Sequence, residues 1–364
     1  MKAAILYEAN QPLQVVDVDQ QGPRAGEARV QVKATGICHS DWHIMNGDWK
    51  LPLPMVLGHE AAGVVEEVGA GVTTVRPGDH IIFSFRPQCG RCFYCSSGRS
   101  ILCDGHQSAR WGMLDGTFRL TRGGQDVFQM ARLGTFAEFV VCPAEMLVPI
   151  RKKMPWPQAA LMGCSVPTGV GAVTNAARVE AGSSVLVVGC GGVGLNVVQG
   201  ARLVGASTII ACDLLDLKLQ FAREFGATHT LNAGAASVVD RVRELTGGRG
   251  VDYAFDAIGG EATTLQIVDA IRPGGTAVIV GMAAMNVRAP ITPYTMALQE
   301  KTLKGTLYGS ARPTVDFPRL VDLYLDGRLK LDQLISRTYP LAGINEGFAA
   351  MRSGGVARGV VVFD

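Results

Sequence analysis

The sequence predicts an α/β protein in which a doubly wound parallel sheet of six strands accompanies a β-rich domain. From about residue 184 onward, short Val-, Ile- and Ala-rich runs alternate with helical patterns. Buried parallel strands that are covered by helices on both faces have this appearance. Before that point, segments such as 28–33 alternate apolar and polar residues, as half-buried strands do. We therefore expect two domains of different construction.

The second half of the chain holds the predicted parallel sheet. We expect its strands at about 184–188, 207–212, 228–231, 252–256, 276–280 and 303–308. Helical periodicity covers 193–204 and 217–225 between them. Six such strands suit a complete dinucleotide-binding fold. Residues 359–363 again have the pattern of a strand, so the predicted divisions are 1–165, 166–307 and a return to the first domain over 308–364.

The composition excludes several classes of protein. The 364 residues are 48% hydrophobic and 18% charged, with a formal net charge of +2 and no basic run, so we expect no nucleic-acid partner. No apolar run reaches the roughly 18–20 residues of a membrane span, and the N-terminus does not have the pattern of a signal peptide. We therefore expect no membrane partner and a cytoplasmic location, where clustered cysteines are metal ligands before they are disulfides.

A short segment, 86–104, holds four cysteines: Cys89, Cys92, Cys95 and Cys103. Thiolates at this spacing can wrap one zinc ion in a closed tetrahedral site that supports the loop and has no open position for chemistry. Gly90 and Gly98 permit the tight turns that wrapping requires. Free thiols or disulfides are the plain alternative, and an iron–sulfur cluster is the stronger one. The absence of an electron-transfer context favours structural zinc.

A glycine-rich turn follows the first predicted parallel strand. Residues 189–194 read Gly-Cys-Gly-Gly-Val-Gly, a G-x-G-x-x-G pattern between a strand and a helix. The glycines allow the backbone to approach a pyrophosphate at the start of the helix. Asp213 ends the next strand, where a carboxylate accepts hydrogen bonds from ribose hydroxyls and repels a 2′-phosphate. This placement predicts NAD as the cofactor.

A second possible metal site is scattered along the chain at Cys38, His59 and Cys164. Two cysteines and one histidine can hold zinc and leave a fourth position open for water or substrate. Judged from spacing alone, the functional and the purely structural interpretations of these residues are equally open.

Five segments together resemble the zinc-containing alcohol dehydrogenases of the medium-chain dehydrogenase/reductase superfamily: 36–43, 58–63 with Gly69, 89–103, 163–169 and 189–194. The resemblance implies a GroES-like catalytic domain and a Rossmann domain. It also implies that Cys38, His59 and Cys164 bind a catalytic zinc and that Glu60 is the nearby carboxylate, giving two Zn²⁺ per subunit.

The reaction that the resemblance implies is the reversible oxidation of primary alcohols, whether aliphatic, allylic or aromatic, to aldehydes. Zinc favours the alkoxide form of its bound alcohol, which passes a hydride to NAD. The family's proton relay maps onto the hydroxyl of Ser40, the cofactor ribose and His43, whose imidazole suits the terminal position.

The resemblance also implies contacts to the cofactor and the substrate. The residues expected at the cofactor are His39, Thr168, Gly189, Gly191, Gly192, Val193, Gly194, Asp213, Lys218 and Arg358. Phe85 would face an apolar substrate pocket, with Trp49, Leu133, Met282 and Leu307 as further wall residues. Cys142, Cys190 and Cys212 are expected to be packing residues. A homodimer formed through the last strand, 302–308, is expected, with a homotetramer as the alternative.

Three other functions stay open. A glutathione-dependent formaldehyde dehydrogenase would need cations for its acidic adduct, and Arg110, Arg119 and Arg122 are available in the sequence. A polyol or threonine dehydrogenase fits the apolar wall less well. A nucleotide-binding protein without catalysis is the alternative of another class, and the joint presence of Cys38, His59 and Cys164 argues against it.

Overall fold

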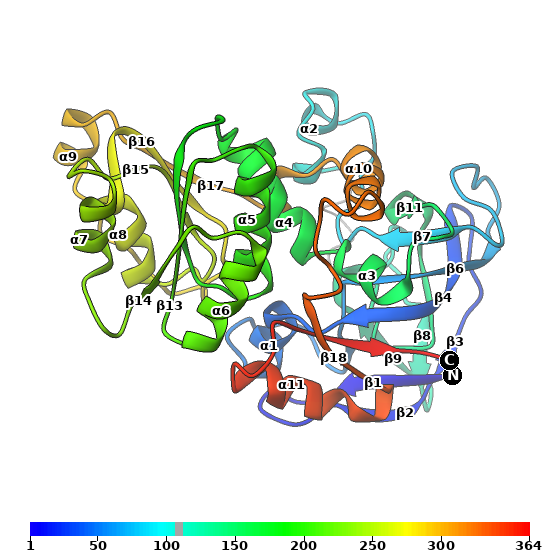
Figure 1. Ribbon diagram of the computed structural model, residues 1–364. Coiled ribbons are helices and arrows are strands. Elements are labelled where there is room, and N and C mark those ends of the chain that lie inside the picture. The colour runs from blue at the N-terminus through cyan, green and yellow to red at the C-terminus, as the bar shows by residue number, and fades with distance from the viewer. Residues whose placement is uncertain (106–111) are drawn as a thin grey trace. The chain divides into compact units, whose positions relative to one another are not determined.

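The structure is a computed structural model, and it describes residues 1–105 and 112–364. The chain divides into two compact units, residues 1–164 with 312–364 and residues 165–311 (Figure 1). Within the described ranges, no helix combines the length and the apolar character needed to cross a membrane.

Unit 165–311 is built on a parallel sheet with the strand order β14-β13-β12-β15-β16-β17. Its strands are β12 (Ser184–Val188), β13 (Thr208–Asp213), β14 (His229–Asn232), β15 (Val251–Asp256), β16 (Ile271–Ile279) and β17 (Thr302–Gly305). Each neighbouring pair runs parallel. The predicted six-stranded sheet is therefore confirmed.

Helices cover both faces of this sheet. They are α4 (Ser165–Gly171), which continues into a π-helical turn at Ala172–Ala177, then α5 (Gly192–Leu203), α6 (Asp216–Phe225), α7 (Val238–Leu245), α8 (Glu261–Ala270) and α9 (Pro293–Leu298). Helices α5 and α6 pack together, as do α7 and α8, and the two pairs lie on opposite faces of the sheet (Figure 1). The continuous apolar strands follow from this, because both faces of β12 and β13 are buried.

The last strand is shorter than the sequence predicted. The prediction ran to residue 308, but β17 ends at Gly305 and a 3₁₀ turn occupies Tyr308–Ser310. Gly309 has a φ of +64°, and a Cβ there would lie 2.2 Å from the carbonyl oxygen of Pro167. The chain must therefore leave the strand to pass closely against α4, a contact that alternation of side chains does not reveal.

Unit 1–164 with 312–364 is β-rich. Its strands are β1 (Lys2–Leu6), β2 (Gln14–Asp17), β3 (Asp19–Gln20), β4 (Glu27–Gly36), β5 (Met55–Val56), β6 (Ala61–Val68), β7 (His80–Phe83), β8 (Leu120–Arg122), β9 (Gln125–Gln129), β10 (Phe139–Pro143), β11 (Leu147–Pro149), β18 (Ile335–Tyr339) and β19 (Arg358–Val362). They form two sheets, β2-β1-β5-β9-β8-β3 and β11-β7-β6-β4-β19-β18, with β10 also paired to β4.

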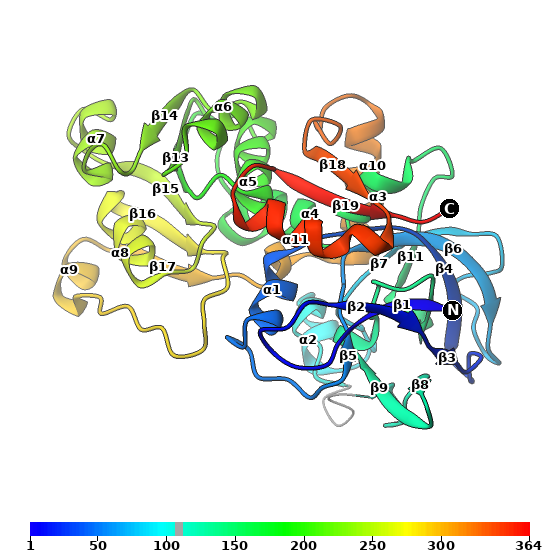
Figure 2. The same ribbon diagram turned by 90° about the horizontal axis from the view of Figure 1, so that it is seen from below.

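Short helices connect these strands. They are α1 (His39–Met45), α2 (Phe93–Ser96), α3 (Trp156–Leu161), α10 (Pro313–Leu325) and α11 (Ile344–Arg352), with 3₁₀ turns at Ser100–Leu102, Met130–Arg132, Ala144–Met146 and Leu341–Gly343. The C-terminal strand β19 pairs antiparallel with β4, where Val360 lies opposite Gly36 (Figure 2). This pairing brings Arg358, at the start of β19, to the end of β4 where the candidate site lies.

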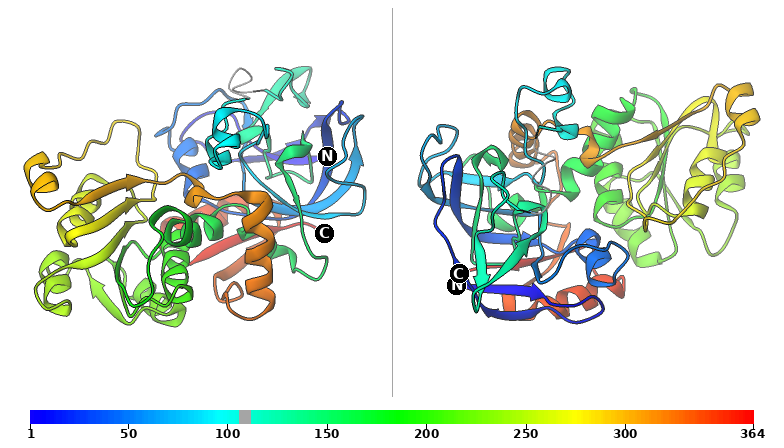
Figure 3. Two further views of the ribbon diagram at one scale, coloured as in Figure 1. Left: turned by 90° about the horizontal axis from the view of Figure 1, so that it is seen from above. Right: turned by 180° about the vertical axis from the view of Figure 1, so that it is seen from behind.

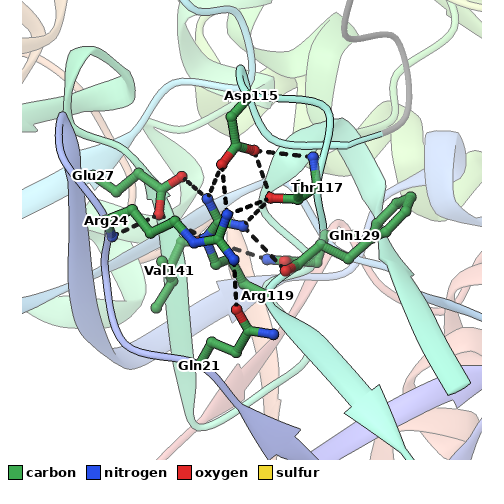
Figure 4. Close-up of polar contacts among 9 residues, drawn as sticks. Gln21, Arg24, Glu27, Asp115, Thr117, Arg119, Gln129 and Val141 are labelled. Atoms are coloured by element: carbon green, nitrogen blue, oxygen red, sulfur yellow. Dashed lines mark hydrogen bonds and ion pairs between the residues drawn. The ribbon is translucent and has the colours of Figure 1, made fainter. Parts of the chain in front are cut away.

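A buried arginine fastens a turn to the start of β4 (Figure 4). Arg119 is fully buried. Its Nε and Nη2 donate to the two oxygens of Glu27 at 2.7 and 2.6 Å, and Nη2 also donates to Asp115 at 2.8 Å. Such two-pronged pairs are strong and specific in geometry, and a buried arginine with this many partners has a structural role.

We predict that Arg119→Met destabilises the β-rich unit by about 3–5 kcal/mol, because Glu27 would remain buried without its cation. Denaturant unfolding of the full chain measures this loss. Arg122→Met is the matched control, since Arg122 lies on the surface next to Tyr7. Equal effects of the two substitutions would contradict a structural role for the buried pair.

Candidate functional site

Three ligand-type residues from distant parts of the chain converge in the β-rich unit. The side-chain ligand atoms of Cys38, His59 and Cys164 all lie within 4.8 Å of one another. Cys38 caps the start of α1, and His59 follows the left-handed Gly58 just before β6. All three side chains are buried, with exposed fractions of 6%, 3% and 7%. The structure therefore brings together the triad that the sequence predicted.

Asp41 holds this triad in place. It is fully buried on α1, and its carboxylate accepts hydrogen bonds from the backbone N–H groups of Cys38, at 3.2 Å, and Gly58, at 2.9 Å. The same carboxylate lies 3.3 Å from Nδ1 of His59. Because Nδ1 is engaged, Nε2 is the nitrogen left for a metal. Asp41 was not among the residues predicted from the sequence, although an acid three residues after a helix cap is a recognisable capping signal.

The charges at the triad reinforce one another. The hydrogen bond with Cys164 holds the pKa of the Cys38 thiol well below its ordinary value, and His59 and Arg358 lower it further. Burial alone lowers the pKa of His59, but Asp41 and Cys38 together raise it to about 10. In the protein without metal, both shifts therefore favour the charged forms, a thiolate at Cys38 and an imidazolium at His59.

This donor set suits zinc. Two sulfur ligands and one imidazole nitrogen are the set found at catalytic zinc sites that keep a fourth position open. Hard cations such as magnesium prefer oxygen ligands instead. Cys38, His59 and Cys164 could therefore hold a zinc ion with three protein ligands.

An ion pair lies directly next to the triad. Glu60 follows His59 in the chain, is fully buried and pairs with Arg358 of β19. A Cβ on Gly36 would lie 2.7 Å from Oε2 of Glu60, so the glycine leaves room for this carboxylate. In the part of the chain that the structure describes, Nε of Arg358 is buried without a hydrogen-bond partner. A polar ligand at this position would satisfy it.

The two predicted relay groups share one face of α1. The sulfur of Cys38 and the hydroxyl of Ser40 are 3.8 Å apart. His43 follows one turn later, and residues three apart on a helix are neighbours. Its Nδ1 lies 2.8 Å from Oδ2 of Asp48, and its ring stacks on Trp49 with centroids 4.9 Å apart. His39, at the start of α1, is exposed.

The predicted pocket residues have different environments. The ring of Phe85 meets His59 edge-to-face, with centroids 5.4 Å apart, so Phe85 lies next to the triad. Leu133 is fully buried and belongs to a hydrophobic core cluster of the β-rich unit, and its place in the pocket wall stays a prediction. Met282, which is 52% exposed, and Leu307 belong to the other unit.

The four-cysteine segment forms a small lobe of the β-rich unit (Figure 3). Its members, whose sulfurs all lie within 4.8 Å of one another, are Cys89, Cys92, Cys95 and Cys103. The sulfurs of Cys92 and Cys103 are 3.8 Å apart, whereas a disulfide requires about 2.05 Å. Two sulfurs on one tetrahedral zinc, each about 2.3 Å from the metal, are separated by about 3.8 Å. None of the four cysteines forms a disulfide in the structure, and the spacing fits one zinc ion.

The backbone of the lobe supports a thiolate at Cys89, whereas burial raises the pKa values of Cys95 and Cys103. Hydrogen bonds from the backbone N–H groups of Arg91 and Cys92 lower the pKa of Cys89 to about 7. Gly90 and Gly98 adopt left-handed φ values of +73° and +77°, as the wrapping turns require. A Cβ on Gly105 would lie only 2.6 Å from the sulfur of Cys89, so this third glycine, which was not predicted from the sequence, also makes room for the cluster.

The glycine-rich turn of the other unit has a specific use for each glycine. Gly189 adopts a φ of +92°, and a Cβ on Gly194 would lie 1.7 Å from the carbonyl oxygen of Gly189. These two glycines let α5 pack tightly against the end of β12. A Cβ on Gly191 would meet nothing within 4 Å. Gly191 therefore leaves its own backbone open at the N-terminus of α5, where a phosphate group can approach.

Asp213 is positioned at this turn. Its Oδ2 accepts a hydrogen bond from the backbone N–H of Cys190 at 2.8 Å, and Oδ1 accepts one from Leu215 at 3.1 Å. The carboxylate retains lone pairs for further donors such as ribose hydroxyls. Lys218 lies on α6 and Thr168 on α4, both in the same unit. Cys142, Cys190 and Cys212 are buried packing residues, as expected.

Comparison with known proteins agrees with this arrangement. Residues 24–152 match the alcohol dehydrogenase GroES-like domain family, and residues 192–326 match the zinc-binding dehydrogenase family. The NDMA-dependent alcohol dehydrogenase of Amycolatopsis methanolica is 43% identical over 99% of this chain and 98% of its own length. The chain belongs to the zinc-containing medium-chain alcohol dehydrogenase family. It is thus an oxidoreductase that acts on alcohols.

Two further members of the zinc alcohol dehydrogenase family are similar over the whole chain. The S-(hydroxymethyl)glutathione dehydrogenase of Paracoccus denitrificans is 39% identical and covers 100% of this chain and 99% of its own. The crystal structure of an alcohol dehydrogenase zinc-binding domain protein from Burkholderia ambifaria has a TM-score of 0.95 at 35% identity, and covers 100% of this chain and 98% of its own. The GroES-like and Rossmann folds that the sequence predicted are confirmed.

The structure shows that fewer of the predicted arginines are available to bind a glutathione adduct. Arg119 is fully buried in its ion pairs with Glu27 and Asp115, so it is unavailable to a substrate. Arg122 contacts the ring and hydroxyl of Tyr7. Arg110 lies outside the described residues.

We predict that loading the buried triad with zinc at pH 7–8 releases at least one proton per ion. His59, whose pKa is about 10, is protonated in this range and must lose its proton to bind metal. Zinc affinity should therefore rise with pH below 10. Titration calorimetry in two buffers of different ionisation enthalpy measures the released proton. The lobe is first saturated as a control, and zero release from the triad would contradict the charge assignment.

Proposed function

We propose that this chain is a zinc-dependent, NAD-linked dehydrogenase that reversibly oxidises primary alcohols to aldehydes. The observation that carries the proposal is the buried triad of Cys38, His59 and Cys164, which supplies three donors, one fewer than zinc usually binds. The same chain contains a glycine-rich turn and an acid for a dinucleotide. A binding protein without catalysis would have no need for the triad.

The proposed chemistry divides between the bound groups and the protein. Zinc, when bound, supplies a Lewis acid that makes an alcohol easier to deprotonate, and NAD accepts the hydride. Cys38, His59 and Cys164 hold the metal, and Asp41 keeps the imidazole of His59 in its binding orientation. The ion pair of Glu60 with Arg358 neutralises charge beside the triad. Cys89, Cys92, Cys95 and Cys103 hold a second zinc that supports the lobe.

The proton of the alcohol leaves along α1 in this proposal. The hydroxyl of Ser40 lies next to Cys38, and His43 lies one turn closer to solvent. His43 is 20% exposed, whereas Cys38 is almost completely buried. A hydroxyl can pass a proton by accepting one and donating another, and the imidazole of His43 exchanges it with water.

NAD is proposed to bind to the glycine-rich turn with its adenosine ribose at Asp213. The open backbone of Gly191 and the oriented carboxylate of Asp213 support this. We extend the cofactor contacts to the remaining residues that the family resemblance implies: His39, Thr168, Gly189, Gly192, Val193, Gly194, Lys218 and Arg358.

The substrate is proposed to be an apolar primary alcohol, because the ring of Phe85 adjoins His59. S-(hydroxymethyl)glutathione is a second candidate, since the Paracoccus relative carries that name at 39% identity. The burial of Arg119 weakens this second candidate. The name of the Amycolatopsis relative also makes NDMA a reagent worth testing as the final oxidant.

A homodimer is the proposed assembly. Strand β17 forms one edge of the parallel sheet and pairs with β16 on one side. Its residues Thr302, Lys304 and Gly305 are exposed. A second copy of the chain could extend the sheet across this edge.

The decisive experiment is a panel of alcohols and aldehydes assayed with NAD, with and without glutathione and NDMA. Turnover of simple alcohols with NAD alone supports the proposal. A strict requirement for glutathione would establish the second candidate substrate. A strict requirement for NDMA would show that NDMA, and not free NAD, is the final oxidant. Binding of NAD without any turnover would overturn the enzymatic assignment.

We predict that Cys164→Ala lowers turnover by about 10⁴-fold or more, the scale seen when an essential catalytic group is removed. Bound zinc should fall from two ions per chain to one, while NAD binding persists because the glycine turn lies in the other unit. Elemental analysis and fluorescence titration measure these quantities. Cys142→Ala is the control, since Cys142 is a buried thiol of the β-sheet core. Two zinc ions retained in the Cys164 variant would refute the metal assignment.

We predict that Asp213→Ser reduces the preference for NAD over NADP by about 10- to 100-fold. Hydrogen bonds to a charged group are worth about 1.5–3 kcal/mol, and the repulsion of a 2′-phosphate would also disappear. The ratio of kcat/KM for the two cofactors measures the change. Asp216→Ser controls for the loss of a nearby carboxylate, because Asp216 bonds to Asn232 at the surface. An unchanged ratio would show that the ribose lies elsewhere.

A further inference from the structure

His43 is one member of a hydrogen-bonded group that the family resemblance did not include. Oδ2 of Asp48 lies 2.8 Å from Nδ1 of His43 and accepts a hydrogen bond from Nδ2 of Asn46, also at 2.8 Å. The backbone N–H of Asp48 donates in turn to Oδ1 of Asn46 at 3.1 Å. The carboxylate is thus oriented by a turn that directly follows α1.

A stacking contact also restrains the imidazole ring of His43, in addition to the hydrogen bond at Nδ1. The ring of Trp49 stacks on His43 at a centroid distance of 4.9 Å and an interplanar angle of 21°. The backbone N–H of Trp49 also donates to the carbonyl oxygen of His43 at 2.9 Å. A stacked ring and a hydrogen-bonded edge together leave the imidazole one orientation, with Nε2 directed away from Asp48.

The contact with His43 favours the ionised form of the Asp48 carboxylate. The hydrogen bond with His43, followed by that with Asn46, lowers the pKa of Asp48. An ionised carboxylate can only accept hydrogen bonds. Nδ1 of His43 must therefore carry the proton, and in the neutral ring Nε2 is left with the lone pair that can accept another.

The other charged groups around α1 have different partners. Asp41, on the same helix, faces His59 and Gly58. Arg352 of α11 lies over the ring of Trp42 at 4.3 Å. Among the described residues, Asp48 is the carboxylate whose contacts are with His43. The exposed side-chain fraction rises from His43, at 20%, to Asp48, at 35%, so the pair lies between the buried triad and solvent.

We propose that Asp48 is a positioning residue of this enzyme, which holds His43 in the Nδ1–H tautomer so that Nε2 accepts the proton released by alcohol oxidation. This inference rests on the proposed function. Oxidation of one alcohol releases a hydride to NAD and a proton. The proton forms an N–H bond at Nε2, and the resulting imidazolium, stabilised by Asp48, returns it to water. Asp48 acts here as the third group of a histidine-based catalytic unit does, by orientation and charge.

The first test measures the tautomer of His43 and does not depend on enzymatic turnover. In the full chain labelled with ¹⁵N-histidine, neutral His43, assigned through His43→Gln, should carry its proton on Nδ1. In Asp48→Ala this preference should be lost. A wild-type His43 with its proton on Nε2 would overturn the proposal even if the enzyme is active. If no alcohol in the panel is turned over, the proposed function fails, yet this measurement still decides whether Asp48 sets the tautomer.

The second test is kinetic. Asp48→Ala should lower kcat/KM for alcohol oxidation about tenfold or more, on the lower side of general-base effects, with NAD affinity unchanged. Adding imidazole as an external base should restore much of the loss. The double variant Asp48→Ala/His43→Gln should be no slower than His43→Gln alone, because the two residues act as one unit. Asp17→Ala, which removes a surface carboxylate paired with Lys2, is the control. Additive losses without rescue by imidazole would show that Asp48 has only a structural role.

Discussion

The carboxylate of Asp41 is the interaction on which the candidate site depends. It is fully buried and joins the backbone at Cys38, the backbone at Gly58 and the ring of His59. Two of the three proposed ligands therefore receive their positions from one side chain. A buried charge is costly unless its partners are complete, and here the backbone N–H groups and the imidazole provide them. The site can be rigid before any metal binds, because the polar network already fixes the donors.

Buried charge is used in the same way elsewhere in the β-rich unit. Glu60 pairs with Arg358, which lies 298 residues further along the chain. Arg119 pairs with Glu27 at the start of β4. The first pair places a cation beside the proposed metal site, and the second lies at the opposite end of β4. The same kind of ion pair therefore occurs beside the proposed metal site and at the turn before β8, and only the surrounding residues distinguish the two.

The unit 165–311 depends on close backbone contact rather than on buried charge. Gly194 allows α5 to approach β12, and Gly309 allows the chain to pass against α4. Gly191 has no such packing need, which makes its backbone available to a ligand. The glycine-rich motif therefore combines two roles, helix packing and cofactor approach. The sequence alone does not show which glycine has which role.

The sequence by itself determined the parts of this protein that depend on short-range pattern. Strand β12 and helices α5 and α6 lie within one residue of their predicted bounds, since periodicity reflects which faces are buried. The four-cysteine lobe was also readable, because its ligands share one short loop. The grouping of Cys38, His59 and Cys164 came from family resemblance, since spacing alone left it open.

Tertiary structure decided what depends on contacts between distant segments or on the environment of a single side chain. The network of Asp41, the pairing of Glu60 with Arg358 and the burial of Arg119 and Leu133 are of this kind. Composition and periodicity report whether a residue prefers to be buried, but not which partner it will meet. Arg119, which the sequence suggested as a possible substrate contact, is therefore buried between Glu27 and Asp115. Asp41, which was not predicted from the sequence, hydrogen-bonds to both segments that carry Cys38 and His59.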